Sequence, residues 1–293
     1  MSSKCSQTCR VCVPQPPSVL ELFRRPAAFS NVSSLKFRGH KFYVLMPERV
    51  LMCTINKVGS TALAMLRSIV RGRSFTWESP QTSCWQIDDV MWCGEAGTGE
   101  REGRRTLASL FADQTWARVV IYRDPLERFV SAFRSKCEQA DHDWRSQCDE
   151  VFGFGRQANG NRQNITLESV ARRLTDPSLR AWTNPHWAPQ RSFCGDLLAS
   201  WPSFTHHLEL HSMASGWLEI LQGRVPPDVL GRLSASLGLA PVGNGGPSPT
   251  RTNRHHTAAA EHTAELSADT RARVRAFYSM DYQMLEHFGV LSS

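Results

Sequence analysis

Residues 51–70, LMCTINKVGSTALAMLRSIV, contain an apolar run, a short polar loop and a periodic apolar pattern in direct succession. The apolar run at 50–55 has the length and aliphatic character of a buried strand. After the loop, apolar side chains return at helical spacing, at Leu63, Leu66, Ile69 and Val70. We therefore predict a buried strand, a tight loop and an amphipathic helix.

The loop has the composition of an anion-binding site, with Lys57, Gly59, Ser60 and Thr61. A strand-to-helix turn presents backbone N–H groups and the positive end of the helix dipole. Gly59 allows close backbone approach and Lys57 adds a charge, so a phosphate or sulfate group fits. Lys57 precedes the glycine, whereas nucleoside-triphosphate loops have the order G-x-x-x-x-G-K-[ST]. An ordinary strand–turn–helix with a solvated lysine is the alternative.

A second segment, RVVIYRDPLERFVSAFRSKC at 118–137, repeats the strand–loop–helix pattern. The run at 119–122 is typical of a buried parallel strand. Asp124 suits the N-cap and Pro125 the first position of the following helix. Arg123 falls at the carboxyl end of the strand, where α/β sheets bind ligands, and its guanidinium suits a phosphate. A solvated basic helix face would account for the other cations, Arg128, Arg134 and Lys136.

The block R-D-P-x-E-R-F-x-S-A-F within this segment resembles the 3′-phosphate-binding segment of carbohydrate sulfotransferases, especially the Golgi family of chondroitin and HNK-1 type. The loop around Lys57 resembles the loop with which sulfotransferases bind the 5′-phosphosulfate of 3′-phosphoadenosine 5′-phosphosulfate (PAPS). Two further segments resemble parts of that family, NPHWAPQRSFC at 184–194 and RVRAFYSMDYQMLEHF at 273–288. The four segments follow the family's order from about residue 43 to residue 288.

The resemblance implies an α/β fold with a P-loop-like three-layer core, in which helices flank a parallel β-sheet. It implies transfer of a sulfuryl group from PAPS to a carbohydrate hydroxyl, without a metal. Lys57 would be catalytic, and His186 is our candidate for the general base. Arg123 and Ser131 would hold the 3′-phosphate. The 5′-phosphosulfate would lie on the loop residues Lys57, Val58, Gly59, Ser60 and Thr61.

The chain departs from the family pattern at two places. Asn56 stands where a proline often precedes the lysine, and residues 201–210 are only loosely similar. These departures leave the acceptor less defined than the donor.

Two other functions stay open. One is a nucleotide-dependent phosphotransferase, against which stand the loop order and the lack of an obvious magnesium-binding aspartate. The other is a catalytically silent glycan-binding protein.

The net charge of +7 across 293 residues favours a polyanionic partner. The basic residues are scattered, and a nucleotide donor with an acidic glycan explains them without nucleic acid.

We expect a tail or linker at 1–38 and a sulfotransferase domain at 39–293. No run reaches the ~20 apolar residues of a membrane span. Golgi lumen or membrane location and membrane anchoring are therefore expected from the resemblance alone.

Nine cysteines suggest disulfide bonds in an oxidising compartment. We predict short loops closed by Cys84 with Cys93 and by Cys137 with Cys148. We interpret Cys53, on the buried strand, as a small core residue. The sequons at Asn31 and Asn164 would carry glycans only in the secretory pathway.

Two histidines at 207 and 211 stand four residues apart, as in a helical metal site. No third ligand is indicated, so partly buried or surface histidines are the favoured interpretation.

Elsewhere we predict strands at 40–45 and 49–55, an insertion at 72–106 and a mobile loop at 138–163. A Gly/Pro-rich connection is expected at 241–249, and helices at 107–111, 166–174, 227–237 and 267–288.

Overall fold

The computed structural model describes residues 41–45, 47–70, 72, 82–87, 90–95, 107–138, 148–154, 165–176, 181, 184–194, 196–237 and 259–291. The predicted tail at 1–38 and the connection at 241–249 lie outside these residues. Most of the loop predicted at 138–163 also lies outside them, as do Asn31 and Asn164 of the two sequons.

The described residues form a six-stranded sheet with the order β3-β4-β1-β2-β5-β6. β1 pairs with β4, β2 with β5 and β5 with β6 in parallel, whereas β1–β2 and β3–β4 are antiparallel. The sheet is therefore mixed, which corrects the prediction of a parallel sheet. The strands are β1 (Lys41–Leu45), β2 (Val50–Thr54), β3 (Thr82–Ile87), β4 (Val90–Glu95), β5 (Ala117–Tyr122) and β6 (His206–Glu209).

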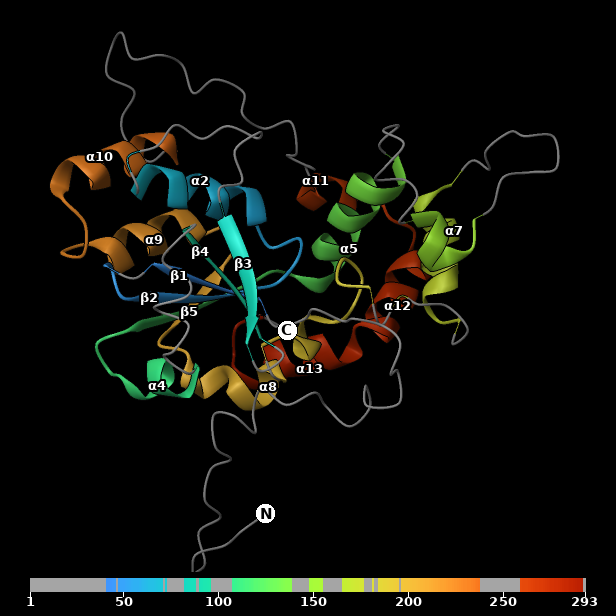
Figure 1. The fold of residues 1–293 in the computed structure, drawn as a ribbon. Coiled ribbons are helices and arrows are strands. Elements are labelled where there is room, and N and C mark those ends of the chain that lie inside the picture. Colours follow the sequence, from blue (N-terminus) through green and yellow to red (C-terminus); the bar gives the residue numbers. More distant parts are fainter. Residues whose placement is uncertain are drawn as a thin grey trace, which may run out of the picture.

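Helices cover both faces of the sheet. In Figure 1, α2, α9 and α10 lie on one face, and α4 and α8 lie on the other. This layering confirms the α/β core expected from the sequence. The helices have these bounds: α2 (Ser60–Val70), α4 (Leu107–Ala112), α8 (Leu197–Ser200), α9 (Met213–Leu221) and α10 (Pro227–Ser236).

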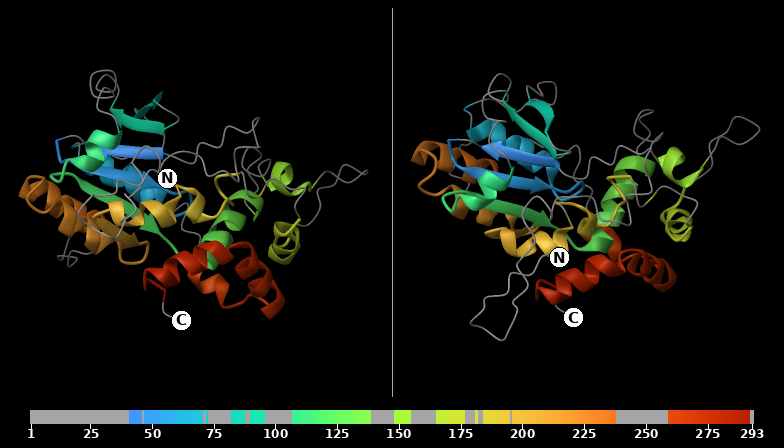
Figure 2. Two further views of the ribbon diagram at one scale, coloured as in Figure 1. Left: turned by 90° about the horizontal axis from the view of Figure 1, so that it is seen from below. Right: turned by 60° about the horizontal axis from the view of Figure 1, so that its bottom comes forward.

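A second group of helices lies beside the sheet, around α5 (Pro125–Phe133), as Figure 2 shows. Its apolar side chains form a core of their own, which includes Phe129, Phe152 and Trp187. Trp187 packs edge-on against Phe152, with ring centroids 4.8 Å apart. The remaining members are α7 (Leu167–Leu174), α11 (Ala259–Thr263) and α12 (Ala268–Phe277), and α13 (Ser279–His287) continues from α12.

The three neighbouring strands β2, β5 and β6 run in the same direction. Their carboxyl ends therefore meet at one edge of the sheet, and each is followed by a short loop and a helix, namely α2, α5 and α9. This edge is where α/β sheets bind their ligands. β6 was not predicted, and it places the segment at 206–212 at the same edge as the Lys57 loop and Arg123.

The start of α5 follows the sequence prediction. Asp124 caps the helix by accepting a hydrogen bond from the Glu127 backbone N–H, and Pro125 occupies the first turn. The helix continues into a π-helical turn, η2 (Arg134–Glu138). Cys137 in this turn forms a disulfide with Cys148, which confirms the predicted pair.

Two regions, one at the C-terminal end and one at 72–106, differ from the sequence prediction. The single helix predicted at 267–288 is divided at Tyr278 into α12 and α13. The buried Tyr278 hydroxyl donates to the Trp187 carbonyl at 2.7 Å, so a tertiary contact holds the break. The predicted insertion at 72–106 contains the β3–β4 hairpin. Its register places Cys84 opposite Cys93, and their disulfide stays a prediction.

Candidate active site

The loop between β2 and α2 has the tight geometry expected of an anion site. Lys57 and Gly59 both adopt left-handed backbone conformations, with φ of 71° and 90°. The conformation of Gly59 favours glycine, and a Cβ there would also lie 2.7 Å from Leu210 Cδ1 and displace that side chain. The Gly59 carbonyl accepts from the Leu63 N–H at 3.0 Å and starts α2. Ser60 and Thr61 therefore contribute their backbone N–H groups to the first turn of the helix.

The Lys57 side chain points toward the π-helical turn after α5. Its Nζ donates to Ser135 Oγ at 2.5 Å. Burial lowers the pKa of Lys57 from 10.5 to about 7, and nearby positive charges add to the shift, from Lys136, Arg128 and Arg123. A lysine held among other cations marks a place where a bound anion would be stabilised.

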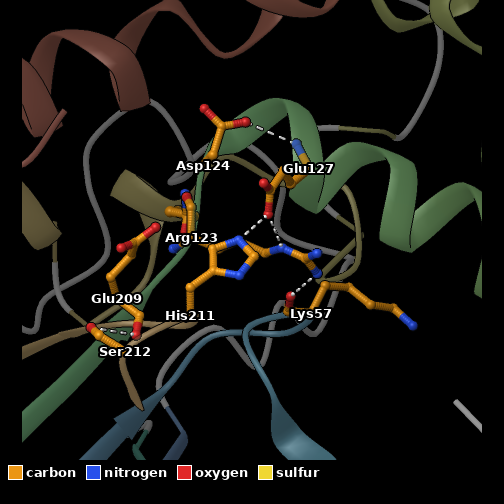
Figure 3. Close-up of polar contacts among 8 residues, drawn as sticks. Lys57, Arg123, Asp124, Glu127, Glu209, His211 and Ser212 are labelled. Carbon is orange, nitrogen blue, oxygen red and sulfur yellow. Dashed lines mark hydrogen bonds and ion pairs between the residues drawn. The ribbon is translucent and has the colours of Figure 1, made fainter. Parts of the chain in front are cut away.

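Arg123 is buried at the carboxyl end of β5, and acceptors fix its guanidinium on two sides. Nε donates to Glu127 Oε2 at 3.1 Å, and Nη1 donates to the Lys57 carbonyl at 3.4 Å, as Figure 3 shows. Its backbone N–H and C=O both bond to the Gln190 side-chain amide. Ser131 lies buried two turns further along α5. The proposed pairing of Arg123 and Ser131 on one phosphate stays a prediction.

The sequence interpretation of a solvated basic face is wrong for two of its three cations. Arg128 is 0% exposed and Lys136 is 1% exposed, whereas Arg134 is partly exposed and pairs with Glu138. The Arg128 guanidinium finds acceptors in three backbone carbonyls. Nε donates to the Asn56 carbonyl at 2.9 Å, Nη1 to Ala188 at 2.7 Å and Nη2 to Pro185 at 3.3 Å.

Arg128 therefore clamps the Lys57 loop to the segment at 184–194. Sequence reasoning missed this role, although Arg128 lies inside the R-D-P-x-E-R-F-x-S-A-F block. A buried guanidinium with several well-placed acceptors is stable, but it cannot lose them without a large cost. A disulfide between Cys53 on β2 and Cys194 ties the same two parts together. This bond corrects the interpretation of Cys53 as a small core residue.

His186 lies in the clamped segment, next to the Lys57 loop. Its Nδ1 is 3.4 Å from Asn56 Nδ2. Burial lowers the pKa of His186 to about 2, assisted by the positive charges of Lys136, Lys57 and Arg128. The imidazole is therefore neutral at physiological pH. An amide nitrogen only donates, so Nδ1 accepts here and Nε2 carries the hydrogen; rotating the Asn56 amide by 180° would exchange these roles.

Helix α13 holds the segment at 184–194 in place through Asp281. The buried Asp281 carboxylate accepts from the backbone N–H groups of Gln190 and Arg191, both at 2.8 Å. Burial raises the pKa of Asp281 to about 6. Gln190 in turn holds the Arg123 backbone, so Asp281 fixes the arginine through one intermediate residue. All four segments singled out in the sequence thus meet around the Lys57 loop.

The two histidines at 207 and 211 do not share a helix face, because residues 206–209 form strand β6. His207 stacks on Trp201 with ring centroids 4.4 Å apart, whereas His211 bonds to Glu127. Within the described residues, no group of three or more His, Cys, Asp or Glu side chains is arranged to hold a metal ion. No helix in the same part of the chain is long and apolar enough for a membrane span.

Comparison with known proteins fits this geometry. The model of the sulfotransferase family matches residues 40–288, a region that includes all four converging segments. Searches of curated proteins and of solved structures gave no match. Because the family match spans most of the 293 residues, the chain belongs to the sulfotransferase family.

Proposed function

We propose that this chain transfers a sulfuryl group from PAPS to a hydroxyl group of a carbohydrate, as enzymes of the Golgi chondroitin and HNK-1 type do. The observation that carries the proposal is the cationic cluster in which the partly buried Lys57 lies among the buried Arg123, Arg128 and Lys136. It lies where a strand-to-helix loop offers backbone N–H groups to an anion. Family membership supports sulfotransfer in general. The donor and the acceptor are our inference.

In the proposed complex the donor lies along the carboxyl edge of the sheet. The 5′-phosphosulfate contacts Lys57 and the backbone N–H groups of Val58, Gly59, Ser60 and Thr61. The 3′-phosphate contacts Arg123 and Ser131. Because Arg128, Gln190 and Asp281 hold these parts in place before any ligand binds, the donor meets a preorganised site.

The reaction is an in-line displacement at sulfur. The acceptor oxygen forms the new S–O bond while the bond from sulfur to the bridging oxygen breaks, and adenosine 3′,5′-bisphosphate leaves. The Lys57 ammonium offsets the negative charge that grows on the bridging oxygen. The hydroxyl proton passes to a base, for which His186 is our candidate.

The electrostatics of His186 fit this role only when donor is bound. Three cations and burial make the imidazole a weak base in the free protein. The negative charges of a bound donor would offset those cations and raise the pKa of His186. Proton transfer through Nε2 also requires the rotated Asn56 amide, in which Oδ1 accepts from Nδ1–H. Asn56 thereby becomes a determinant of basicity.

The acceptor and the location are inferred from the net charge and from the disulfides. A net charge of +7 favours an acidic glycan over a neutral one. The Cys53–Cys194 and Cys137–Cys148 disulfides fit an oxidising compartment and support the proposed Golgi lumen.

Isothermal titration calorimetry with adenosine 3′,5′-bisphosphate tests the donor assignment. Adenosine 5′-monophosphate and magnesium-ATP serve as controls. We expect tight binding that requires the 3′-phosphate, followed by sulfate transfer to acidic glycans that Lys57→Ala abolishes. Preference for magnesium-ATP would instead support a phosphotransferase. Nucleotide binding without any product would support a silent glycan-binding protein.

A further inference from the structure

His211 lies at the turn between β6 and α9 and reaches the site from a strand that sequence patterns did not predict. β5 and β6 pair in parallel with Tyr122 opposite Glu209, so Arg123, one residue after Tyr122, and His211, two residues after Glu209, both lie at the carboxyl edge. The turn is fixed by hydrogen bonds from Leu210 N–H to the Tyr122 carbonyl and from Ser212 N–H to the Glu209 carbonyl. The backbone thus holds His211 beside Arg123.

His211 and Arg123 share a single carboxylate oxygen. His211 Nε2 lies 2.8 Å from Glu127 Oε2, the same atom that accepts from Arg123 Nε at 3.1 Å. Figure 3 shows the imidazole and the guanidinium meeting at this oxygen from two sides. Because a carboxylate only accepts, His211 Nε2 carries the hydrogen.

This arrangement leaves one edge of the Arg123 guanidinium for a ligand. Nε is bound by Glu127 and Nη1 by the Lys57 carbonyl. Within the described part of the chain, Nη2 has no hydrogen-bond partner. The direction in which Nη2 points depends on the position of the Glu127 carboxylate, and that position depends on the second donor, His211.

We propose that His211 is a positioning residue for the donor's 3′-phosphate: it holds the Glu127 carboxylate so that Arg123 presents its free guanidinium edge to that phosphate. The inference rests on the proposed function and adds His211 to it, as a residue that acts on the 3′-phosphate through Glu127 and Arg123. His211 does not contact the reacting atoms. It therefore affects how strongly the 3′-phosphate is bound and leaves the transfer step itself unchanged.

The test compares His211→Ala and His211→Gln with the wild-type protein by titration calorimetry. Glutamine can place an amide N–H near the position of the imidazole Nε2–H, whereas alanine cannot. The matched control is His262→Ala, which removes another exposed histidine–glutamate pair, with Glu265 at 3.1 Å, away from the sheet edge. Each protein is titrated with adenosine 3′,5′-bisphosphate and with adenosine 5′-monophosphate, and thermal melting is recorded.

We expect His211→Ala to weaken binding of the bisphosphate about fivefold, the worth of one hydrogen bond, and to leave binding of the monophosphate unchanged. KM for PAPS should rise by the same factor while kcat stays within about twofold. Glutamine should restore the bisphosphate affinity, and the control should match the wild type in all readouts.

Two results would overturn the inference while leaving the proposed function intact. In the first, His211→Ala keeps the wild-type ratio of the two affinities. In the second, both affinities and the melting temperature fall together, and glutamine does not rescue them, which indicates a general structural role. If the wild-type protein itself does not prefer the bisphosphate, the proposed function fails, and the role of His211 fails with it.

Discussion

Replacing Lys57 with methionine should abolish turnover and at the same time stabilise the folded protein. The pKa of Lys57 falls from 10.5 to about 7 on folding. At pH 7 the unfolded chain holds this proton fully, whereas the folded chain holds only about half of it. The linkage relation then gives a penalty of about 4 kcal/mol at pH 7. Methionine removes the penalty and forfeits the hydrogen bond to Ser135, worth about 1 kcal/mol.

The net gain in the free energy of unfolding for Lys57→Met is therefore about 3 kcal/mol at pH 7. Its sign and pH dependence follow from a lowered lysine pKa. The penalty is complete below pH 7, shrinks to about 2 kcal/mol at pH 9 and vanishes above the unfolded value of 10.5. The advantage of the methionine variant should shrink in the same way as the pH rises.

Urea denaturation followed by tryptophan fluorescence, at pH 6, 7 and 9, measures this difference. Arg134→Met is the matched control, because it removes a partly exposed cation from the neighbouring turn. Its effect should stay within about 0.5 kcal/mol and should not vary with pH. A Lys57→Met protein that is less stable than the wild type at pH 7, or a difference that does not change between pH 7 and 9, would refute the reasoning.

Three further predictions concern the same site. Arg128→Met should lower the free energy of unfolding by about 3–5 kcal/mol, because three carbonyls, buried or partly buried, lose their donor, and denaturation in urea measures the loss. Binding of adenosine 3′,5′-bisphosphate at pH 8 should take up about one proton, mostly onto Lys57, and calorimetry in buffers of different ionisation enthalpy counts it. Arg123→Ala should weaken the bisphosphate at least about tenfold and spare adenosine 5′-monophosphate; equal losses for both nucleotides would contradict a role at the 3′-phosphate.

Local signals in the sequence were sufficient for the elements that position the donor loop. The apolar run before Lys57 and the helical spacing after it gave β2 and α2, because both patterns act within a few residues. The same holds for the cap at Asp124 and the proline at the start of α5. The short cysteine pair Cys137–Cys148 was also predictable, since few residues separate its members.

The features that failed prediction depend on partners distant in the sequence. Arg128 is a charged residue on a helix, and its burial is made favourable by the carbonyls of Asn56, Pro185 and Ala188, which come from distant segments. Strand β6 is four residues long, too short to show a clear alternation, and it exists because β5 offers it an edge. The apolar run around Cys53 indicates a core residue, and only the fold brings its disulfide partner Cys194 beside it.

The Cys53–Cys194 bond also determines how the chain must be oxidised. Its two cysteines are 141 residues apart, and the Cys137–Cys148 pair lies inside the loop that it closes. Since short loops close more readily, the Cys137–Cys148 pair should form first. In the unfolded chain, Cys53 is closer in sequence to Cys84 and Cys93 than to Cys194. Correct pairing of Cys53 therefore requires either native folding of β2 beforehand or a disulfide isomerase. Recombinant yield of a protein with an intact donor loop will depend on that step.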